Sequence, residues 1–180
     1  MNRFIVDNLP HRIAEALCDQ HIVKMPLEEA QMLCTALWHH APSYAVQRGL
    51  YKPAHQKHPC TLWSQATRAN YLWAVSLYVH MLREYSYRFG KQHGAAKHEV
   101  AIINGMMHIP EGPYTRPPQC FGAHESCKTD EFWPVNAYRS FYRADKASFA
   151  RWTKNRQAPK WWSSDCGKIA TLDDKYSFVI

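Results

Sequence analysis

The segment Asp19–Trp38 reads DQHIVKMPLEEAQMLCTALW. With about 100° between successive residues of a helix, most of its polar side chains fall within an arc of about 80°. Apolar residues flank this arc and cover the opposite face, where Glu29 is almost the only polar residue. The polar stripe consists of His21, Lys24, Glu28, Gln31 and Thr35.

A narrow polar stripe is typical of a buried helix with one polar edge along a cavity, because a solvated helix presents a broad polar half. Ionisable groups in such a cavity have shifted pKa values and are candidates for an active site. We therefore take Glu28, Lys24 and His21 as candidate catalytic residues. The alternative is that Lys24 and Glu28, spaced i and i+4, form a structural ion pair.

Length and composition predict a single domain covering residues 1–180, since 180 residues with 46% hydrophobic content can bury one core. No apolar run is long enough to span a membrane and no signal peptide precedes Asp7, so we expect a cytoplasmic protein without membrane contact. In that compartment the six cysteines should be reduced thiols or metal ligands and not a set of disulfides. The formal net charge of +7 favours a polyanionic partner, and double-stranded DNA is the first candidate.

Helix caps and turn residues predict an all-α fold, a compact helical bundle with long loops. Residues 39–59 contain the motifs HHAP and KPAHQKHP and predict a loop. We expect five helical segments. The first begins near Pro10, and the second covers 19–38 with a kink or a break at Pro26. The third runs from Thr61 or Ser64 to just before Gly90, the fourth is a short element at 99–107, and the fifth covers 134–154.

Basic residues fall in two places that suit contact with a phosphate backbone. The loop 39–59 is basic and stiffened by prolines, and the helix expected at 134–154 has an aromatic face opposite a basic face. The alternative is that both are merely solvated. A tryptophan after the helix could stack on a base, and an asparagine beside two tryptophans needs a partner if it is buried. The candidate DNA-binding residues are Lys52, Lys57, His58, Asn70, Arg139, Arg143, Lys146, Arg156 and Trp161.

The motif Cys120-x3-His124-x2-Cys127 has the spacing of zinc ligands, and His108 or Cys166 could provide a fourth ligand. A structural zinc site usually has two close pairs of ligands, which this motif lacks. We therefore expect no metal at this cluster and no cofactor, so that a chelator should leave the helicity unchanged.

Three motifs carry a resemblance to a known family. They are Met1-x-Arg3, Asp19-Gln20-His21 and Glu28 seven residues after that histidine, with looser matches at Leu82, Glu84, Arg88 and Pro159-x-Trp161. In these the chain resembles the phage pyrimidine-dimer DNA glycosylase and AP lyase family known as endonuclease V. The resemblance implies a compact helical domain that kinks double-stranded DNA, a catalytic role for Glu28 and a phosphate contact for Arg3. The chain also resembles uncharacterised phage proteins, which share His58-Pro59, Trp63 and the Tyr138-Arg139 to Trp161-Trp162 tail.

The nucleophile is open at this point. In that family it is the amine of a threonine exposed by methionine removal, whereas Asn2 follows Met1 in this chain. The candidates are the amine of Met1, a buried Lys24 amine, and water activated by Glu28. Each requires the target base to be extruded from the duplex.

We therefore expect a DNA repair enzyme, an N-glycosylase with or without AP lyase activity, acting on a damaged or modified base. One alternative is a phage transferase that modifies DNA bases, which needs the same extruded base and basic surface. The other is a non-catalytic DNA-binding or host-interaction protein, in which the polar stripe is a structural network.

Overall fold

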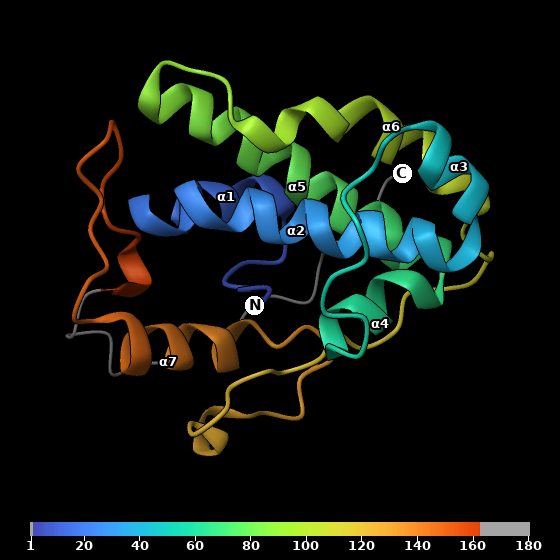
Figure 1. Ribbon diagram of the computed structural model, residues 1–180. Coiled ribbons are helices and arrows are strands. Elements are labelled where there is room, and N and C mark those ends of the chain that lie inside the picture. Colours follow the sequence, from blue (N-terminus) through green and yellow to red (C-terminus); the bar gives the residue numbers. More distant parts are fainter. Residues whose placement is uncertain (1, 163–180) are drawn as a thin grey trace.

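Helix α2 (Asp19–His40) lies at the centre of the fold in the computed structural model, which describes residues 2–162 (Figure 1). Every residue from Met32 to Leu37 is buried, as expected for an interior helix. Pro26 removes one backbone hydrogen bond, yet α2 continues through it. Of the two alternatives predicted at Pro26, a kink or a break, the break is wrong, because packing on neighbouring helices holds both halves in one helix.

All regular structure within residues 2–162 is helical, which confirms the predicted all-α class. No helix in this part of the chain has the length and apolar character needed to cross a membrane. Besides α2, the α-helices are α1 (Pro10–Ala16), α3 (Pro42–Gln47), α4 (Pro59–Ala66), α5 (Arg68–Phe89), α6 (Glu99–Asn104) and α7 (Val135–Lys146), and the short 3-10 helices are η1 (Gly94–His98), η2 (Gly105–His108), η3 (Glu125–Cys127) and η4 (Lys160–Trp162).

The helices lie on both sides of α2. Helix α5 packs against α1, α2 and α4, whereas α7 lies on the other side of α2 in Figure 1, with the N-terminal segment, residues 2–7, between them. Phe4 of this segment stacks on His21 of α2 at 4.5 Å and on Phe141 of α7 at 6.2 Å between ring centroids. One hydrophobic core therefore extends across both sides of α2.

Helix α3 replaces part of the loop predicted for residues 39–59. Pro42 occupies its first turn, where a missing N–H does no harm. Ala45 is fully buried, and the Tyr44 hydroxyl donates to the Ala101 carbonyl at 2.7 Å. The prediction of a loop was wrong for residues 42–47 because contacts with distant parts of the chain stabilise this short helix.

The long helix predicted up to Gly90 is in fact two helices. The chain is extended at Thr67, whose hydroxyl accepts a hydrogen bond from the Asn70 N–H at 3.2 Å and so caps α5. Helix α4 begins at Pro59, earlier than predicted, and ends before this cap. The predicted end of α5 is confirmed, since Gly90 adopts a left-handed φ of 66°.

Helix α7 is shorter than predicted: it ends at Lys146 instead of near residue 154. Beyond it the chain turns back toward the end of α1, where the Trp152 Nε1–H donates to the Ala16 carbonyl at 3.0 Å. A longer helix would carry the Trp152 ring away from this contact. A tertiary contact therefore overrides the local helical pattern.

Arg88 joins three helices at a buried junction. Its Nε donates to the Glu84 carboxylate at 2.6 Å, and its Nη1 donates to the Leu17 carbonyl at 2.9 Å and to Asp19 at 3.0 Å. Arg156, from the segment after α7, donates to the same Glu84 at 2.8 Å. Burial raises the pKa of Glu84, but the hydrogen bonds from Arg156 and Arg88 outweigh it and hold this pKa below its usual value.

Arg3 anchors the N-terminal segment in the interior, where the residue is 2% exposed. Its Nε donates to Glu29 Oε2 at 3.0 Å, and its Nη2 pairs with Glu29 Oε1. The same Nη2 donates to the Ser64 hydroxyl at 2.8 Å, and the guanidinium lies 5.1 Å from the centre of the Trp63 ring. The segment is thereby fixed to both α2 and α4.

We predict that Arg3→Met lowers the free energy of unfolding by about 3–5 kcal/mol, because it leaves Glu29 buried and unpaired. The double variant Arg3→Met/Glu29→Leu should recover most of this loss, since neither charge then remains in the core. Urea unfolding monitored by circular dichroism measures both. Glu111→Gln, at the exposed pair Arg68–Glu111, is the control and should change stability little. Equal losses in Arg3→Met and in the control would contradict the prediction.

Candidate functional site

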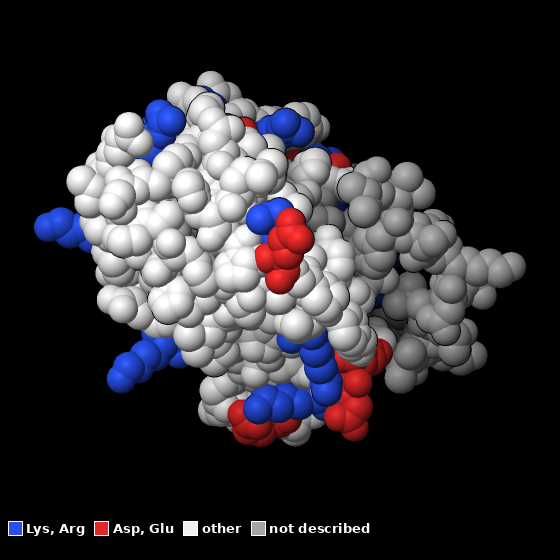
Figure 2. Space-filling model, turned by 90° about the vertical axis from the view of Figure 1, so that its right-hand side faces the viewer, with Lys and Arg blue, Asp and Glu red and all other residues white. Residues whose placement is uncertain are grey.

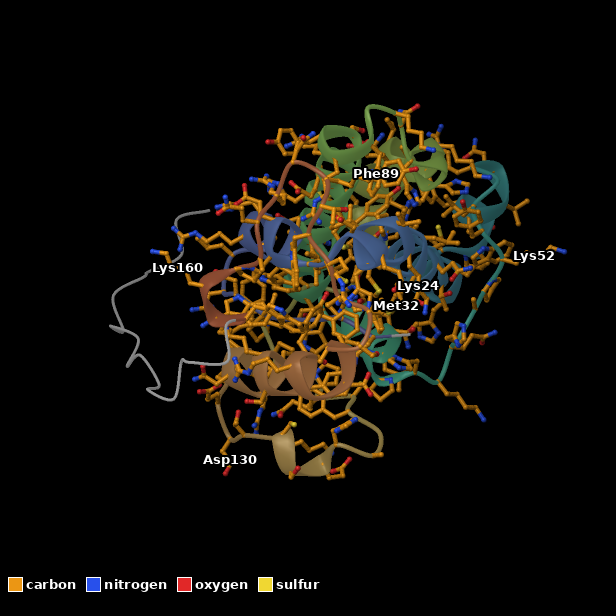
Figure 3. The ribbon with its side chains drawn as sticks, turned by 90° about the vertical axis from the view of Figure 1, so that its left-hand side faces the viewer. Lys24, Met32, Lys52, Phe89, Asp130 and Lys160 are labelled. Carbon is orange, nitrogen blue, oxygen red and sulfur yellow. The ribbon has the colours of Figure 1, made fainter. Side chains whose placement is uncertain are left out.

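A cavity of about 350 Å³ lies between α2, α7, the N-terminal segment and residues 120–124. Figure 3 labels Lys24 on α2, with α7 (orange) below it. The three candidate catalytic residues of α2 meet in this cavity. Its polar lining residues are Asn2, His21, Lys24, Glu28, His124, Asp145 and Lys146, and its aromatic ones are Phe4, Phe121 and Phe141.

Glu28 lines the cavity with a side chain that is 13% exposed, and its Oε1 lies 3.2 Å from Lys24 Nζ. The i, i+4 ion pair therefore exists, and it lies at the cavity wall. Lys24 itself is 64% exposed. Because the amine nucleophile considered for Lys24 depends on burial, this exposure argues against Lys24 in that role.

The polar stripe of α2 divides into two parts with different environments. Its first part, from His21 to Glu28, lines the cavity. Its last residue, Thr35, is buried and accepts a hydrogen bond from the Ala54 N–H at 3.0 Å, while its hydroxyl lies 2.7 Å from the Gln31 carbonyl. This end of the stripe anchors the loop between α3 and α4.

His21 is held as a neutral imidazole. Burial, followed by the charges of Lys146 and Lys24, lowers the pKa of His21 to about 3. The Cys18 N–H donates to the Tyr142 hydroxyl oxygen at 3.0 Å, and that hydroxyl lies 2.7 Å from His21 Nδ1. Burial raises the pKa of Tyr142, so this hydroxyl keeps its hydrogen, which it can donate to Nδ1. In the tautomer that accepts this hydrogen bond, the imidazole proton lies on Nε2 and makes His21 a hydrogen-bond donor.

A second set of ionisable groups reaches the cavity from α7 and the preceding loop. His124 Nε2 lies 3.0 Å from Asp145 Oδ1, and Asp145 also pairs with Lys146. The hydrogen bond from Lys146 and the contact with His124 lower the pKa of Asp145. The Lys146 ammonium lies 5.5 Å from the centre of the Phe4 ring. The sequence predicts a phosphate contact for Lys146 and gives no signal for Asp145.

The ligand atoms of the motif Cys120-x3-His124-x2-Cys127 do not come together as a metal-binding group in the described part of the chain. His124 Nε2 is occupied by Asp145, whereas Cys120 Sγ lies 3.8 Å from the sulfur of Cys60. His108 packs on the Tyr44 ring at 4.7 Å between centroids. The other proposed fourth ligand, Cys166, lies outside the described residues.

Two predicted DNA-binding residues are structural. Arg3 pairs with Glu29 in the core, so a phosphate contact by Arg3 is incompatible with this structure. Asn70 is fully buried, and its amide donates to the Trp63 carbonyl at 2.9 Å and to the Thr115 hydroxyl at 2.8 Å. The expectation that a buried Asn70 needs partners is confirmed, but its role is to hold the loop after α6 against α4.

The arginines predicted to form an outer basic face are bonded within the molecule. Arg139 donates to the Val6 carbonyl and Arg143 donates to the Trp161 carbonyl, both at 2.8 Å. Arg156 is bonded to Glu84 of α5, as described above. The Trp161 ring lies 5.7 Å from the Arg139 guanidinium, partly buried. Periodicity cannot distinguish a solvated arginine from one whose side chain binds carbonyl groups, so this part of the prediction is corrected.

Lys52 and Lys57 are exposed, as predicted for the loop before α4. Figure 3 shows Lys52 projecting away from the body of the molecule. His58 is half-buried, and its Nδ1 caps α4 by accepting the Cys60 N–H at 3.2 Å. On the face shown in Figure 2, lysines and arginines are scattered around a large uncharged area. Met1, one of the three candidate sources of the nucleophile, lies outside the described residues.

We predict that His21 gives the protein an acid-sensitive stability. Its folded pKa lies below the ordinary value of 6.5, so between pH 6.5 and pH 3 the unfolded chain binds a proton that the folded chain excludes. Stability from this group is present above pH 6.5 and should fall by about 2 kcal/mol between pH 6.5 and 5. Urea unfolding across this range should show a flatter profile for His21→Phe. The exposed control His55→Gln should keep the wild-type slope, and equal slopes in all three proteins would contradict the prediction.

Comparison of the chain with models of protein families, with curated proteins and with solved structures gave no match. The resemblance to the endonuclease V family therefore rests on the quoted motifs alone. The site residues are assigned here from geometry, burial and charge.

Proposed function

We propose that this chain binds double-stranded DNA and hydrolyses the N-glycosidic bond of a damaged or modified base extruded into the cavity. One observation carries the proposal: the shielded carboxylate of Glu28 lies on the wall of a cavity of about 350 Å³ together with His21 and aromatic rings. This volume is within the usual range for small-molecule sites and suits one base with its sugar.

The proposed reaction assigns one task to each wall of the cavity. Phe4, Phe121 and Phe141 line the cavity with apolar ring atoms against which an extruded base can pack. Glu28 accepts a proton from a water molecule whose oxygen attacks the sugar C1′. The bond from C1′ to the base nitrogen breaks, and its electron pair leaves with the base, which later takes a proton from solvent. The Nε2–H of His21 donates a hydrogen bond that stabilises the departing base.

Water is the proposed attacking species because the amine of Lys24 is poorly placed for that role. Lys24 is mostly exposed, and its ammonium is paired with Glu28. With water as nucleophile, no covalent enzyme–DNA intermediate forms and no lyase step follows. Lys24 then serves as a cation at the cavity wall, where it can contact a phosphate beside the extruded nucleotide.

The proposed DNA surface continues from the cavity along α2. The Trp38 indole on α2 donates to the Tyr51 carbonyl at 2.9 Å, and Thr35 is bonded to Ala54. These contacts hold the loop with Lys52 and Lys57 beside the helix that carries Lys24. Lys24, Lys52 and Lys57 therefore lie along one helix. We propose these three lysines as the phosphate contacts, in place of the arginines of α7.

We predict that Glu28→Gln decreases base release by at least about a hundredfold while DNA affinity and stability change little, as expected for loss of a general base. A panel of duplexes with single damaged or modified bases, assayed under single-turnover conditions, measures the rate. Glu111→Gln is the matched control and should keep the wild-type rate. If Glu28→Gln releases the base at the wild-type rate per folded molecule, Glu28 is not catalytic and serves only as the ion-pair partner of Lys24.

Borohydride trapping during the same assay separates the nucleophiles. We expect no covalent adduct. An adduct lost in Lys24→Ala would place the amine on α2, whereas one lost only when the N-terminus is blocked would place it at Met1. DNA binding without base release across the panel would instead support the non-catalytic alternative. A gain of mass on a base would support the transferase.

We predict that the double variant Lys52→Glu/Lys57→Glu weakens binding to all duplex sequences alike. If each lysine neutralises one phosphate, the slope of log K against log salt should decrease by about 2. Fluorescence anisotropy at several salt concentrations measures this slope. Arg83→Glu/Lys91→Glu changes the net charge equally at exposed positions near the end of α5 and should keep the slope. Equal effects in both variants would show that net charge alone drives binding.

A further inference from the structure

Three potential metal ligands from distant parts of the chain converge beside the cavity. His58 and Cys60 lie at the start of α4, and Cys120 lies in the long segment between η2 and α7. One ligand atom from each of these residues lies within 4.8 Å of the other two. This set is not visible as a sequence motif, because about sixty residues separate the pair from the third ligand and the ligand motifs of structural zinc sites have short spacings.

The distance between the two sulfur atoms suits a tetrahedral metal ion. Cys60 Sγ and Cys120 Sγ are 3.8 Å apart. Two zinc–sulfur bonds of about 2.3 Å at a tetrahedral angle place their sulfurs about 3.8 Å apart, whereas a disulfide requires about 2.05 Å. The pair is therefore already spaced for an ion and would have to move together to form a disulfide.

The contact between the two thiols favours the thiolate form of Cys120 and disfavours that of Cys60. The hydrogen bond from Cys60 lowers the pKa of Cys120, while that same contact and burial raise the pKa of Cys60. The nearby guanidinium of Arg3 also stabilises the thiolate form of both groups. A bound cation would replace the protons of the thiols that ligate it.

We propose that His58, Cys60 and Cys120 form a binding site for a thiophilic divalent ion of the zinc class. Two thiolates and one imidazole form a donor set that zinc prefers, and three protein ligands leave the fourth tetrahedral position to water. The ion would link the start of α4 to the long segment before α7. Cys120 also lines the cavity, so the ion would fix that wall. The site does not depend on the proposed glycosylase activity.

The test is a zinc titration of the full-length, reduced protein in competition with a chromophoric chelator. We expect one zinc ion per chain. Cobalt should give the intense visible bands of a tetrahedral site and the charge-transfer band of thiolate ligation. Cys120→Ser and His58→Ala should each weaken zinc binding by at least about a hundredfold, since even outer-shell changes weaken it by 10–100-fold. Cys127→Ser, in the same long segment but outside the set, is the matched control and should bind zinc like the wild type.

Several outcomes would overturn the proposal. They are no zinc binding by the reduced wild type, equal affinity in Cys120→Ser and in the control, and a cobalt spectrum without thiolate bands. Circular dichroism of each variant tests whether a loss of zinc binding is caused by unfolding. His58→Ala changes a residue outside the hydrophobic core and should therefore keep the fold. A Cys60–Cys120 disulfide in air, together with failure of the reduced protein to bind zinc, would identify a redox pair instead.

Discussion

The rest of the structure depends on the buried ion pair between Arg3 and Glu29. Two charges in an apolar interior require their mutual hydrogen bonds, so the N-terminal segment cannot slide along α2 without leaving both unpaired. Because Asn2 and Phe4 flank Arg3, the same constraint positions two residues of the cavity wall. Adjacent acidic residues of α2 thus have opposite roles: Glu29 holds the segment in the core, and Glu28 faces the cavity.

The features of the fold that arise from local signals could be predicted from the sequence. The periodicity of residues 19–38 predicted the helix α2, and the glycine at position 90 predicted the end of α5. Both signals depend on residues close together in the sequence. The end of α7 was missed because it depends on the contact between Trp152 and Ala16, which lie far apart in the sequence. Local propensity cannot anticipate a contact of that kind.

The candidate site was predictable only where one helix supplies it. His21 and Glu28 share a face of α2, so their meeting at one cavity followed from helical spacing. The role of Asp145 depends on the docking of α7 and carries no comparable signal. Arg143 was predicted to contact DNA, but its side chain donates to the Trp161 carbonyl. The helical pattern alone does not reveal such a partner.

The cavity joins the two ends of the described chain. The Tyr138 hydroxyl lies 3.0 Å from Asn2 Oδ1, and Tyr142 bonds to Cys18 and His21. Helices α1 to α5 can pack through contacts made earlier in synthesis, but this wall requires α7. This wall of the cavity therefore forms only after α1 to α5 have been synthesised. A chain that ended after α6 would lack the residues of α7 that line the cavity.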